Sequence, residues 1–153
     1  MSALAQLMAD EGARVTGSDN ARFPTLDAVE KRSIPVVIGY AASNIPEDIE
    51  LIVPTDAAHP DNTERMEAIR RGLPQQSYFK ALGEASKGKR TIAVAGTHGK
   101  TTTTGMLAKI LKDAGVSPTA IVGSIVKDFG SNYLPGTSDL FVVEACEYRD
   151  HLL

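Results

Sequence analysis

The clearest chemical signal in the sequence is the segment Gly96-Thr97-His98-Gly99-Lys100-Thr101, which directly follows the apolar run at residues 91–95. A glycine-rich turn between a strand and a helix directs backbone N–H groups and the helix N-terminus at a phosphate. In such a loop Lys100 reaches the outer phosphates of a nucleotide, and the hydroxyl of Thr101 is a ligand for Mg²⁺. We therefore predict a nucleotide site formed by Gly96, Thr97, His98, Gly99, Lys100, Thr101 and Thr102.

The match to the usual phosphate loop is incomplete, because Val94 stands where that pattern has its first glycine. An ordinary glycine-rich turn is the alternative interpretation. The context favours a phosphate loop, since residues 91–95 suit a strand and the residues from Lys100 onward suit a helix. The β-branched threonines at 101–104 are poor helix formers and fit a helix start whose hydroxyls face a ligand. For His98 we expect loop shaping or a phosphate contact rather than general catalysis.

An acidic residue is placed to complete this site. Glu144 ends the apolar run at residues 140–143, and an acid at the end of a strand beside a phosphate loop can hold Mg²⁺ directly or through water. Glu147 is a second candidate, whereas Cys146 is interpreted as a small packing residue. A strand-end acid that only faces solvent is the alternative. The predicted catalytic residues are Lys100 and Glu144, and the predicted metal ligands are Thr101 and Glu144.

A second group of polar residues lies nearer the N-terminus. Asp19 ends a short predicted strand, where nucleotide-binding βαβ units place an acid against a ribose hydroxyl. Ser18 can add a hydrogen bond, and a helix N-cap or turn acid is the alternative for Asp19. Thr55 and Asp56 follow another predicted strand and are expected at the same sheet edge, where ligands bind in open α/β sheets.

The elements that position these residues alternate between helices and strands, which predicts an α/β fold with a doubly wound parallel sheet. The predicted helices cover residues 1–10, 26–32, 62–71, 78–85 and 100–114. The predicted strands cover residues 14–19, 35–38, 49–53, 91–95, 119–122 and 140–145, with a short one at 73–75. The side chains expected to face inward are Met66 and Ile69 in one helix, and Met106, Leu107, Ile110, Leu111 and Ala114 in the last.

The polar, glycine-containing segment at residues 84–90 is the best domain boundary. It separates a Rossmann-like unit at residues 1–86 from the start of a phosphate-loop α/β domain at residues 90–153. The first helix has no strand or glycine loop before it, and few residues follow residue 145. We therefore expect a chain that begins and ends inside larger units, the alternative being a domain that starts with a helix.

The composition excludes several classes of protein. With 42% hydrophobic and 23% charged residues among 153, a soluble globular protein is expected. The net charge of −3 argues against nucleic-acid binding, and the basic residues at 87–90 suit a solvated linker. One cysteine fits a reducing cytosol, and neither a membrane helix nor a secretory signal is expected. We therefore expect a cytoplasmic protein without a membrane or nucleic-acid partner.

Read as one motif, residues 93–103 resemble the ATP-binding signature of the Mur ligases, the ATP-dependent amide ligases of peptidoglycan precursor synthesis. The resemblance covers the whole chain. Residues 1–5 are similar to the segment after the family's first glycine loop, and residues 15–19 are similar to its second strand. Residues 144–147 are similar to its Glu-Ala-Asp-Glu, with Cys146 in place of an acid. Asn132 and Gly136 correspond to its substrate loop.

The resemblance implies ATP and Mg²⁺ as cofactors, and UDP-N-acetylmuramate and L-alanine as substrates joined through an acyl phosphate. It implies substrate contacts at Ser18, Asp19, Thr55 and Asn132. The histidine in the loop and Gly17-Ser18-Asp19 favour the family member that adds L-alanine. Gly39-Tyr40 and Glu147-Tyr148 lean toward the member that attaches a recycled tripeptide.

Two other classes stay open on the sequence. A phosphate-loop kinase or GTPase places its loop near the N-terminus, whereas here residues 1–90 form another α/β unit before the loop. A non-catalytic nucleotide-binding module is the other alternative, since a partial chain carries only part of each site.

Overall fold

A computed structural model of the chain describes residues 1–145, which form two β-sheets. Strands β1 (Gly17–Asp19) and β2 (Val36–Ile38) make a small parallel pair. The larger sheet has the order β3-β6-β4-β5 and comprises β3 (Arg90–Val94), β4 (Thr119–Val126), β5 (Ser131–Leu134) and β6 (Leu140–Glu144). Strand β6 is parallel to β3 and β4, while β5 pairs antiparallel with β4. The predicted α/β class with mainly parallel strands is confirmed.

Strand β6 is buried on both faces, which explains its nearly continuous apolar sequence. Successive side chains of a strand point to opposite faces, so Phe141 and Val143 lie on one side and Val142 on the other. Phe141 and Val143 pack with α1 (Ser2–Asp10) and α4 (Tyr78–Ser86). Val142 packs with α5 (Lys100–Asp113). The larger sheet is therefore the middle layer between α1 and α4 on one face and α5 on the other.

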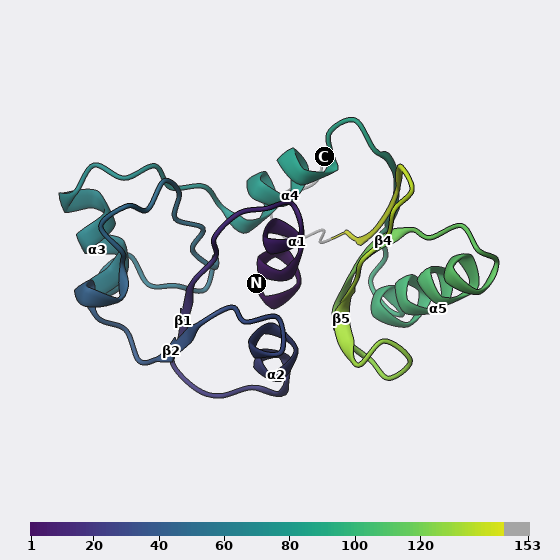
Figure 1. Ribbon diagram of the computed structural model, residues 1–153, viewed down its shortest axis with the longest axis horizontal. Coiled ribbons are helices and arrows are strands. Elements are labelled where there is room, and N and C mark those ends of the chain that lie inside the picture. Colours follow the sequence, from purple (N-terminus) through teal and green to yellow (C-terminus); the bar gives the residue numbers. More distant parts are fainter. Residues whose placement is uncertain (146–153) are drawn as a thin grey trace.

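Helix α1 lies between the small sheet and the larger one (Figure 1). Its residues Ala3, Leu4 and Leu7 are each only 2% exposed and share one hydrophobic cluster with Ile121 of β4 and Tyr133 of β5. Burial of these aliphatic side chains contributes roughly 1.5–3 kcal/mol for each leucine. The helix therefore ties the N-terminal part of the chain to the larger sheet.

A buried polar network reinforces the same contact. Asn132 of β5 donates from its amide to the hydroxyl of Ser2 at 3.0 Å, and Ser131 donates to Oε1 of Gln6 at 3.1 Å. Gln6 is 1% exposed and Asn132 is 6% exposed. Because a buried polar group without a partner is costly, this network favours one register of α1 on β5.

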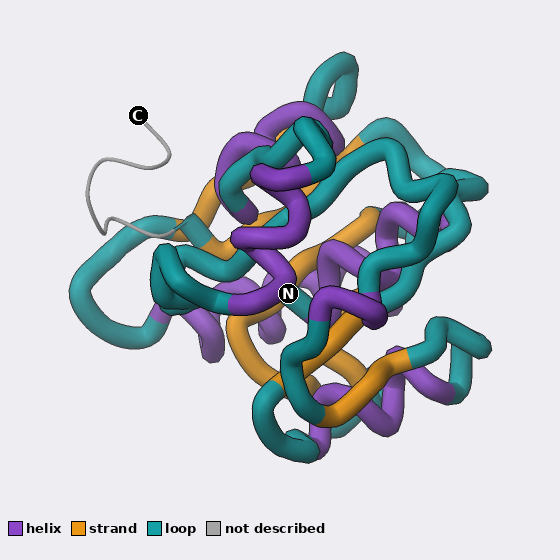
Figure 2. The backbone as a smooth tube through the Cα atoms, turned by 90° about the vertical axis from the view of Figure 1, so that its left-hand side faces the viewer, coloured by secondary structure: helices purple, strands orange, loops and turns teal. Residues whose placement is uncertain are grey.

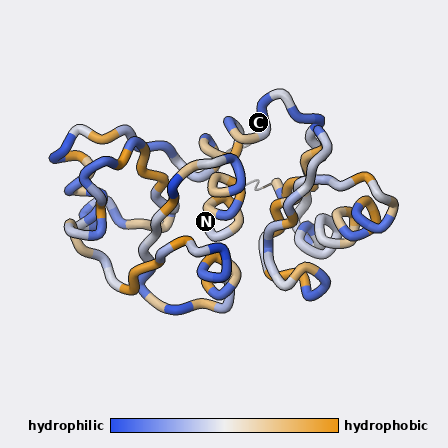
Figure 3. Tube along the Cα trace, in the orientation of Figure 1, coloured by the Kyte–Doolittle hydropathy of each residue, from blue (hydrophilic) through white to orange (hydrophobic). Residues whose placement is uncertain are grey.

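Helix α5 buries only part of the predicted face. Ala108 is fully buried, and Leu107 and Leu111 pack beside it against the sheet. Met106 and Ile110 are each 60% exposed and Ala114 is also exposed, so the prediction that these three residues face inward is wrong. The small residues of α5 are the physical reason, since they let the helix approach the sheet closely and turn the larger side chains outward. Figure 3 shows this mixture of hydrophobic and hydrophilic positions along α5.

The segment between β2 and α4 consists largely of loops (Figure 2). It includes the short 3₁₀ helix η1 (Ala42–Asn44) and α3 (Thr63–Arg70). The predicted strands at residues 49–53 and 73–75 are wrong, because only an isolated parallel bridge joins Ile52 to Gln75. Pro54 and Pro74 flank the bridge and donate no N–H, which limits a ladder here.

Helices α2 (Pro24–Glu30) and α3 form close to the predicted positions. Asn62 caps α3 by accepting hydrogen bonds from the N–H groups of Glu64 and Arg65. Ala68 is the fully buried residue of α3, whereas Met66 is 51% exposed and Ile69 is 59% exposed. The prediction that Met66 and Ile69 face inward is wrong, because α3 is buried at Ala68 instead.

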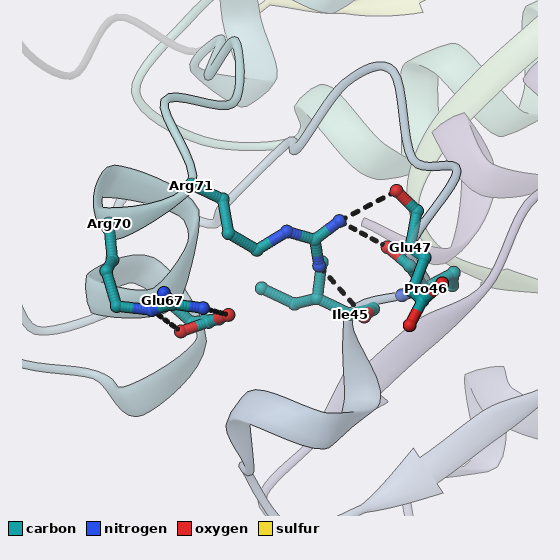
Figure 4. A network of polar contacts seen from close by, with 6 residues as sticks. All are labelled: Ile45, Pro46, Glu47, Glu67, Arg70 and Arg71. Carbon is teal, nitrogen blue, oxygen red and sulfur yellow. Dashed lines mark hydrogen bonds and ion pairs between the residues drawn. The ribbon is translucent and has the colours of Figure 1, made fainter.

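Arg71, at the end of α3, holds the loop that follows η1 (Figure 4). Its guanidinium donates to the carbonyl oxygens of Ile45, Pro46 and Glu47 at 2.8–3.1 Å. The neighbouring Arg70 points away and pairs with Glu67 on the exposed side of the helix. Arg71 therefore holds the loop, whereas Arg70 contacts only the exposed surface of α3.

Strand β5 is absent from the predicted elements, and β4 extends four residues beyond its predicted end at Val122. The sequence Ser131-Asn132-Tyr133-Leu134 is short and half polar, so its pattern does not indicate a strand. All four residues are nevertheless buried. The packing of α1 and the pairing with β4 therefore determine that these four residues form a strand.

Candidate functional site

The predicted phosphate loop connects β3 to α5 as expected. Gly96 has φ of +137° and Gly99 has φ of +77°, and Gly99 is the N-cap of α5. Both values are strained for residues with a side chain, which explains why glycine occupies these positions. The Nζ of Lys100 donates to the carbonyl oxygen of Gly96 at 2.5 Å, so its side chain folds back over the loop. The loop residues 96–99 are exposed and therefore open to a ligand.

Glu144 lies beside this loop, as predicted. Strands β3 and β6 run parallel with Val94 opposite Glu144, so the acid emerges where β3 enters the loop. Thr101, at the start of α5, donates its hydroxyl hydrogen to Oε1 of Glu144 at 2.9 Å. The tertiary structure thus brings together two residues that are 43 positions apart.

The other carboxylate oxygen of Glu144 is held by the neighbouring strand. The N–H of Gly123 in β4 donates to Oε2 at 2.7 Å. The glycine also leaves the space that the carboxylate occupies, since a Cβ atom on residue 123 would lie 2.6 Å from Oε2. Sequence reasoning missed Gly123, because the predicted strand ended at Val122 and the glycine was placed just outside it.

An open cavity of about 440 Å³ adjoins Thr101 and Thr102. It lies between α5 and the end of β4, and its lining residues include Gly105, Met106, Ser124 and Asp128. Thr102 is exposed in the first turn of α5. Two of the seven predicted nucleotide residues, Thr101 and Thr102, therefore border this recess, whereas residues 96–100 do not line it.

The residues predicted for a second ligand are arranged differently. Asp19 ends β1 as predicted, and its Oδ1 accepts the N–H of Asn20 at 2.8 Å. Ser18 donates its hydroxyl hydrogen to Oε2 of Glu64 in the first turn of α3. Glu64 also accepts a hydrogen bond from the amide of Asn44 at 2.7 Å, so it joins β1, η1 and α3.

Glu64 is thus a second residue that sequence reasoning missed. Its place after Asn62 indicates only a helix start, because the contact with Ser18 spans 46 positions. The structure brings Ser18 and Glu64 together at the end of β1.

Thr55 and Asn132 do not join either group. Thr55 is exposed in a turn that its own hydroxyl supports by accepting the N–H of Ala57, and no strand precedes it. The expectation that Thr55 follows a strand at residues 49–53 is therefore wrong. Asn132 lies in strand β5 rather than in a loop, and its side chain contacts Ser2 and Gln6 of α1.

Cys146 and Glu147 lie outside the described residues. Within residues 1–145, no three His, Cys, Asp or Glu side chains gather closely enough to form a metal site by themselves. The helices of the same residues include none long and apolar enough to cross a membrane.

Comparisons with known proteins agree with this arrangement. Residues 1–90 match the family model described as "Mur ligase family, catalytic domain", and residues 94–147 match "Mur ligase middle domain". A UDP-N-acetylmuramate–L-alanine ligase of Desulfitobacterium hafniense is 46% identical over 100% of this chain and 34% of its own length. The ligase of the same name from Clostridium kluyveri is 41% identical over the same shares. The chain spans about a third of the length of these curated relatives.

Solved structures show the same fold. A crystal structure of UDP-N-acetylmuramate:L-alanyl-γ-D-glutamyl-meso-diaminopimelate ligase from Neisseria meningitides matches 97% of this chain and 49% of that chain, with a TM-score of 0.87 and 32% identity. The UDP-N-acetylmuramate–alanine ligase of Thermotoga maritima matches 94% of this chain and 34% of that chain, with a TM-score of 0.84 and 32% identity. With both family models matched in sequence order and the loop joined to its strand-end acid, this chain belongs to the Mur ligase family.

Proposed function

We propose that this chain forms the UDP-sugar site and the centre of the ATP site of an amide ligase that joins L-alanine to UDP-N-acetylmuramate. The observation that carries the proposal is the hydrogen bond from Thr101 to Glu144, because it unites the phosphate loop with the strand-end acid. The names of the curated relatives support these two substrates. Residues 1–86 form the UDP-sugar unit in this proposal, and residues 90–153 begin the ATP unit.

The ATP phosphates bind at the start of α5. The backbone N–H groups of residues 96–99 and the N-terminus of the helix face the phosphate oxygens. Lys100 leaves its contact with the carbonyl oxygen of Gly96 and binds the outer phosphates. This exchange is favourable because a phosphate oxygen is a charged acceptor and a carbonyl oxygen is a neutral one.

The donor atoms at the site fit Mg²⁺. This ion prefers oxygen ligands and is usually held by one or two carboxylates together with phosphates and water. The hydroxyl of Thr101 and the carboxylate of Glu144 supply such oxygens side by side. When bound, Mg²⁺ neutralises negative charge on the phosphate groups.

The UDP-sugar binds at the end of β1. Asp19 and Ser18 contact the uridine end, and Glu64 orients the hydroxyl of Ser18. Thr55 and Asn132 are further proposed substrate contacts. Thr55 is exposed, whereas Asn132 must exchange its bond to Ser2 for one to the substrate.

The proposed reaction has two steps. A carboxylate oxygen of UDP-N-acetylmuramate attacks the γ-phosphorus of ATP, ADP leaves, and an acyl phosphate forms. The amine of L-alanine then attacks the acyl carbon, and inorganic phosphate leaves. Such a transfer depends on positioning and on charge neutralisation, which Lys100 and the loop N–H groups supply.

A ligase that attaches a tripeptide to the same UDP-sugar is the second candidate. The likeness to the ligase from Neisseria meningitides, at a TM-score of 0.87, favours it. The identities of 41–46% to curated alanine ligases favour the first candidate, whereas the solved structures of both kinds of ligase are equally 32% identical to this chain. The candidate from another class is a module that binds a nucleotide without turnover. It would describe the 153-residue chain acting by itself.

The deciding experiment uses a chain extended to the length of the curated relatives. It is supplied with UDP-N-acetylmuramate, ATP and Mg²⁺, together with either L-alanine or the tripeptide, and the release of inorganic phosphate is measured. We expect release that depends on L-alanine. Release with the tripeptide alone would select the second candidate, and release with neither would reject both ligases.

A further inference from the structure

Gly123 of β4 contributes to the position of Glu144 in two ways, because its backbone N–H makes a hydrogen bond and its missing side chain leaves space for the carboxylate. Its backbone N–H donates to Oε2 at 2.7 Å, while Oε1 accepts the hydroxyl hydrogen of Thr101 at 2.9 Å. Both oxygens of the carboxylate are therefore oriented, one by a strand and one by a helix. A backbone N–H fixes the carboxylate without cancelling its charge, so the group stays attractive to a cation.

The absence of a side chain at residue 123 is equally important. A Cβ atom there would lie 2.6 Å from Oε2, 2.9 Å from Cδ and 2.9 Å from Oε1 of Glu144. All three atoms belong to the free end of a flexible side chain, so the clash can be relieved by moving the carboxylate while the backbone stays in place. The cost of a side chain at this position therefore falls on the site and not on the fold.

Gly136 shows the opposite case. A Cβ atom on Gly136 would lie 2.1 Å from the carbonyl carbon and 2.3 Å from the carbonyl oxygen of Pro118. These are backbone atoms of a buried residue, and they cannot move away without distorting the start of β4. The two glycines therefore differ in what a methyl group would disturb.

We propose that Gly123 is a positioning residue for the Mg²⁺–nucleotide site, which acts by holding the carboxylate of Glu144 against β4 and beside Thr101. The inference rests on the proposed function, because it concerns the same site. Beyond the proposed ligands Thr101 and Glu144, the site then also requires a glycine at residue 123 of β4.

The first test compares the 153-residue chain with its Gly123→Ala and Gly83→Ala variants. Gly83 is the matched control, because it lies inside α4 and a Cβ atom there meets nothing within 4 Å. ATP binding is measured by calorimetry at a series of Mg²⁺ concentrations and again in EDTA. We expect Gly123→Ala to raise the Mg²⁺ concentration for half-maximal binding by about tenfold or more, the effect of losing one charge-assisted hydrogen bond. Binding in EDTA and the thermal midpoint should stay close to those of Gly83→Ala.

A rescue variant separates positioning from general damage. Glu144→Asp shortens the side chain by one methylene group and makes room for a methyl group on residue 123. Each single variant should raise the Mg²⁺ concentration for half-maximal ATP binding by some factor. We expect the factor for Gly123→Ala/Glu144→Asp to be smaller than the product of the two single factors. Strictly multiplicative effects would show that the two positions act independently and would overturn the inference.

A third measurement needs no ligand. The amide proton of Gly123 is observed by NMR in the ligand-free chain and in Glu144→Ala, where its acceptor is removed. We expect this signal to shift upfield, and an unchanged signal would overturn the inference. Wild-type chain that shows no Mg²⁺-dependent ATP binding would instead count against the proposed function, while a Gly123→Ala variant equal to wild type would overturn the inference alone.

Discussion

Tyr133 of β5 donates its hydroxyl hydrogen to Oδ2 of Asp10, the last residue of α1, at 2.9 Å. The same carboxylate pairs with Arg32, whose guanidinium lies 5.1 Å from the centre of the Tyr133 ring. These residues come from α1, from the turn after α2 and from the larger sheet. They therefore form a polar contact between the proposed UDP-sugar unit and the proposed ATP unit.

Tyr133→Phe should lower the free energy of unfolding by about 1–2 kcal/mol at neutral pH, because it removes a part-buried hydrogen bond to a charged acceptor. Urea unfolding measures the difference. Tyr40→Phe is the control, since Tyr40 is 42% exposed, and it should have no measurable effect. A loss as large in the control would show that the Asp10 contact is not responsible.

The same pair predicts a pH dependence. Burial and the bond to Asp10 raise the pKa of Tyr133 in the folded chain above its ordinary value. The stability that Tyr133 contributes is therefore full below about pH 10, the pKa of an unfolded tyrosine, and is lost as the pH rises above it. The difference in unfolding free energy between wild type and Tyr133→Phe should shrink above pH 10. A difference that grows with pH in urea titrations would contradict this assignment.

Lys100→Ala should remove nearly all ligation in the chain extended to the length of its relatives, because the outer phosphates lose their cation. Phosphate release in the presence of all substrates is the measurement. Lys31→Ala, in the turn after α2, is the matched control for the loss of a lysine and should keep the wild-type rate. Wild-type rates in Lys100→Ala would reject the proposed ATP site.

Gly136→Ala should destabilise the chain by about 1–3 kcal/mol or more, the usual cost of forcing extra volume into a packed region. The clash is with the backbone of Pro118, so thermal unfolding is the measurement that should change. Gly83→Ala should be neutral or slightly stabilising, because alanine is favoured over glycine inside a helix. Equal midpoints for the two variants would contradict the packing of Gly136.

Arg71→Met should loosen the loop after η1, since it removes the hydrogen bonds to three carbonyl oxygens. Faster amide exchange in residues 45–61 is the expected result, with little change in the larger sheet. Arg70→Met is the neighbouring control, because Arg70 is 72% exposed in its pair with Glu67 and exposed pairs contribute little. Equal exchange in both variants would show that the loop does not depend on Arg71.

The helix starts and the glycine-rich loop between β3 and α5 could be predicted because their signals are local. Asn62 caps α3, Gly99 precedes α5, and the apolar run at 140–143 forms β6, each within one turn or one strand of the residues that define it. The expectation that Glu144 lies beside the loop was also confirmed, because parallel strands end at the same edge of a sheet.

The remaining features depend on contacts between distant residues. Met106 and Ile110 fit an inward stripe by spacing, yet Ala108 faces the sheet because the small residue allows the closest approach. Strand β5 exists because β4 pairs with it and α1 covers it, and residues 49–53 form no strand because no full partner lies beside them. The contacts of Gly123 with Glu144 and of Glu64 with Ser18 span 21 and 46 positions. Periodicity and capping act over a few residues, so the sequence by itself determined where the helices, the loop and the acid are. Only the packing of the whole chain decided which faces are buried and which residues hold the site in place.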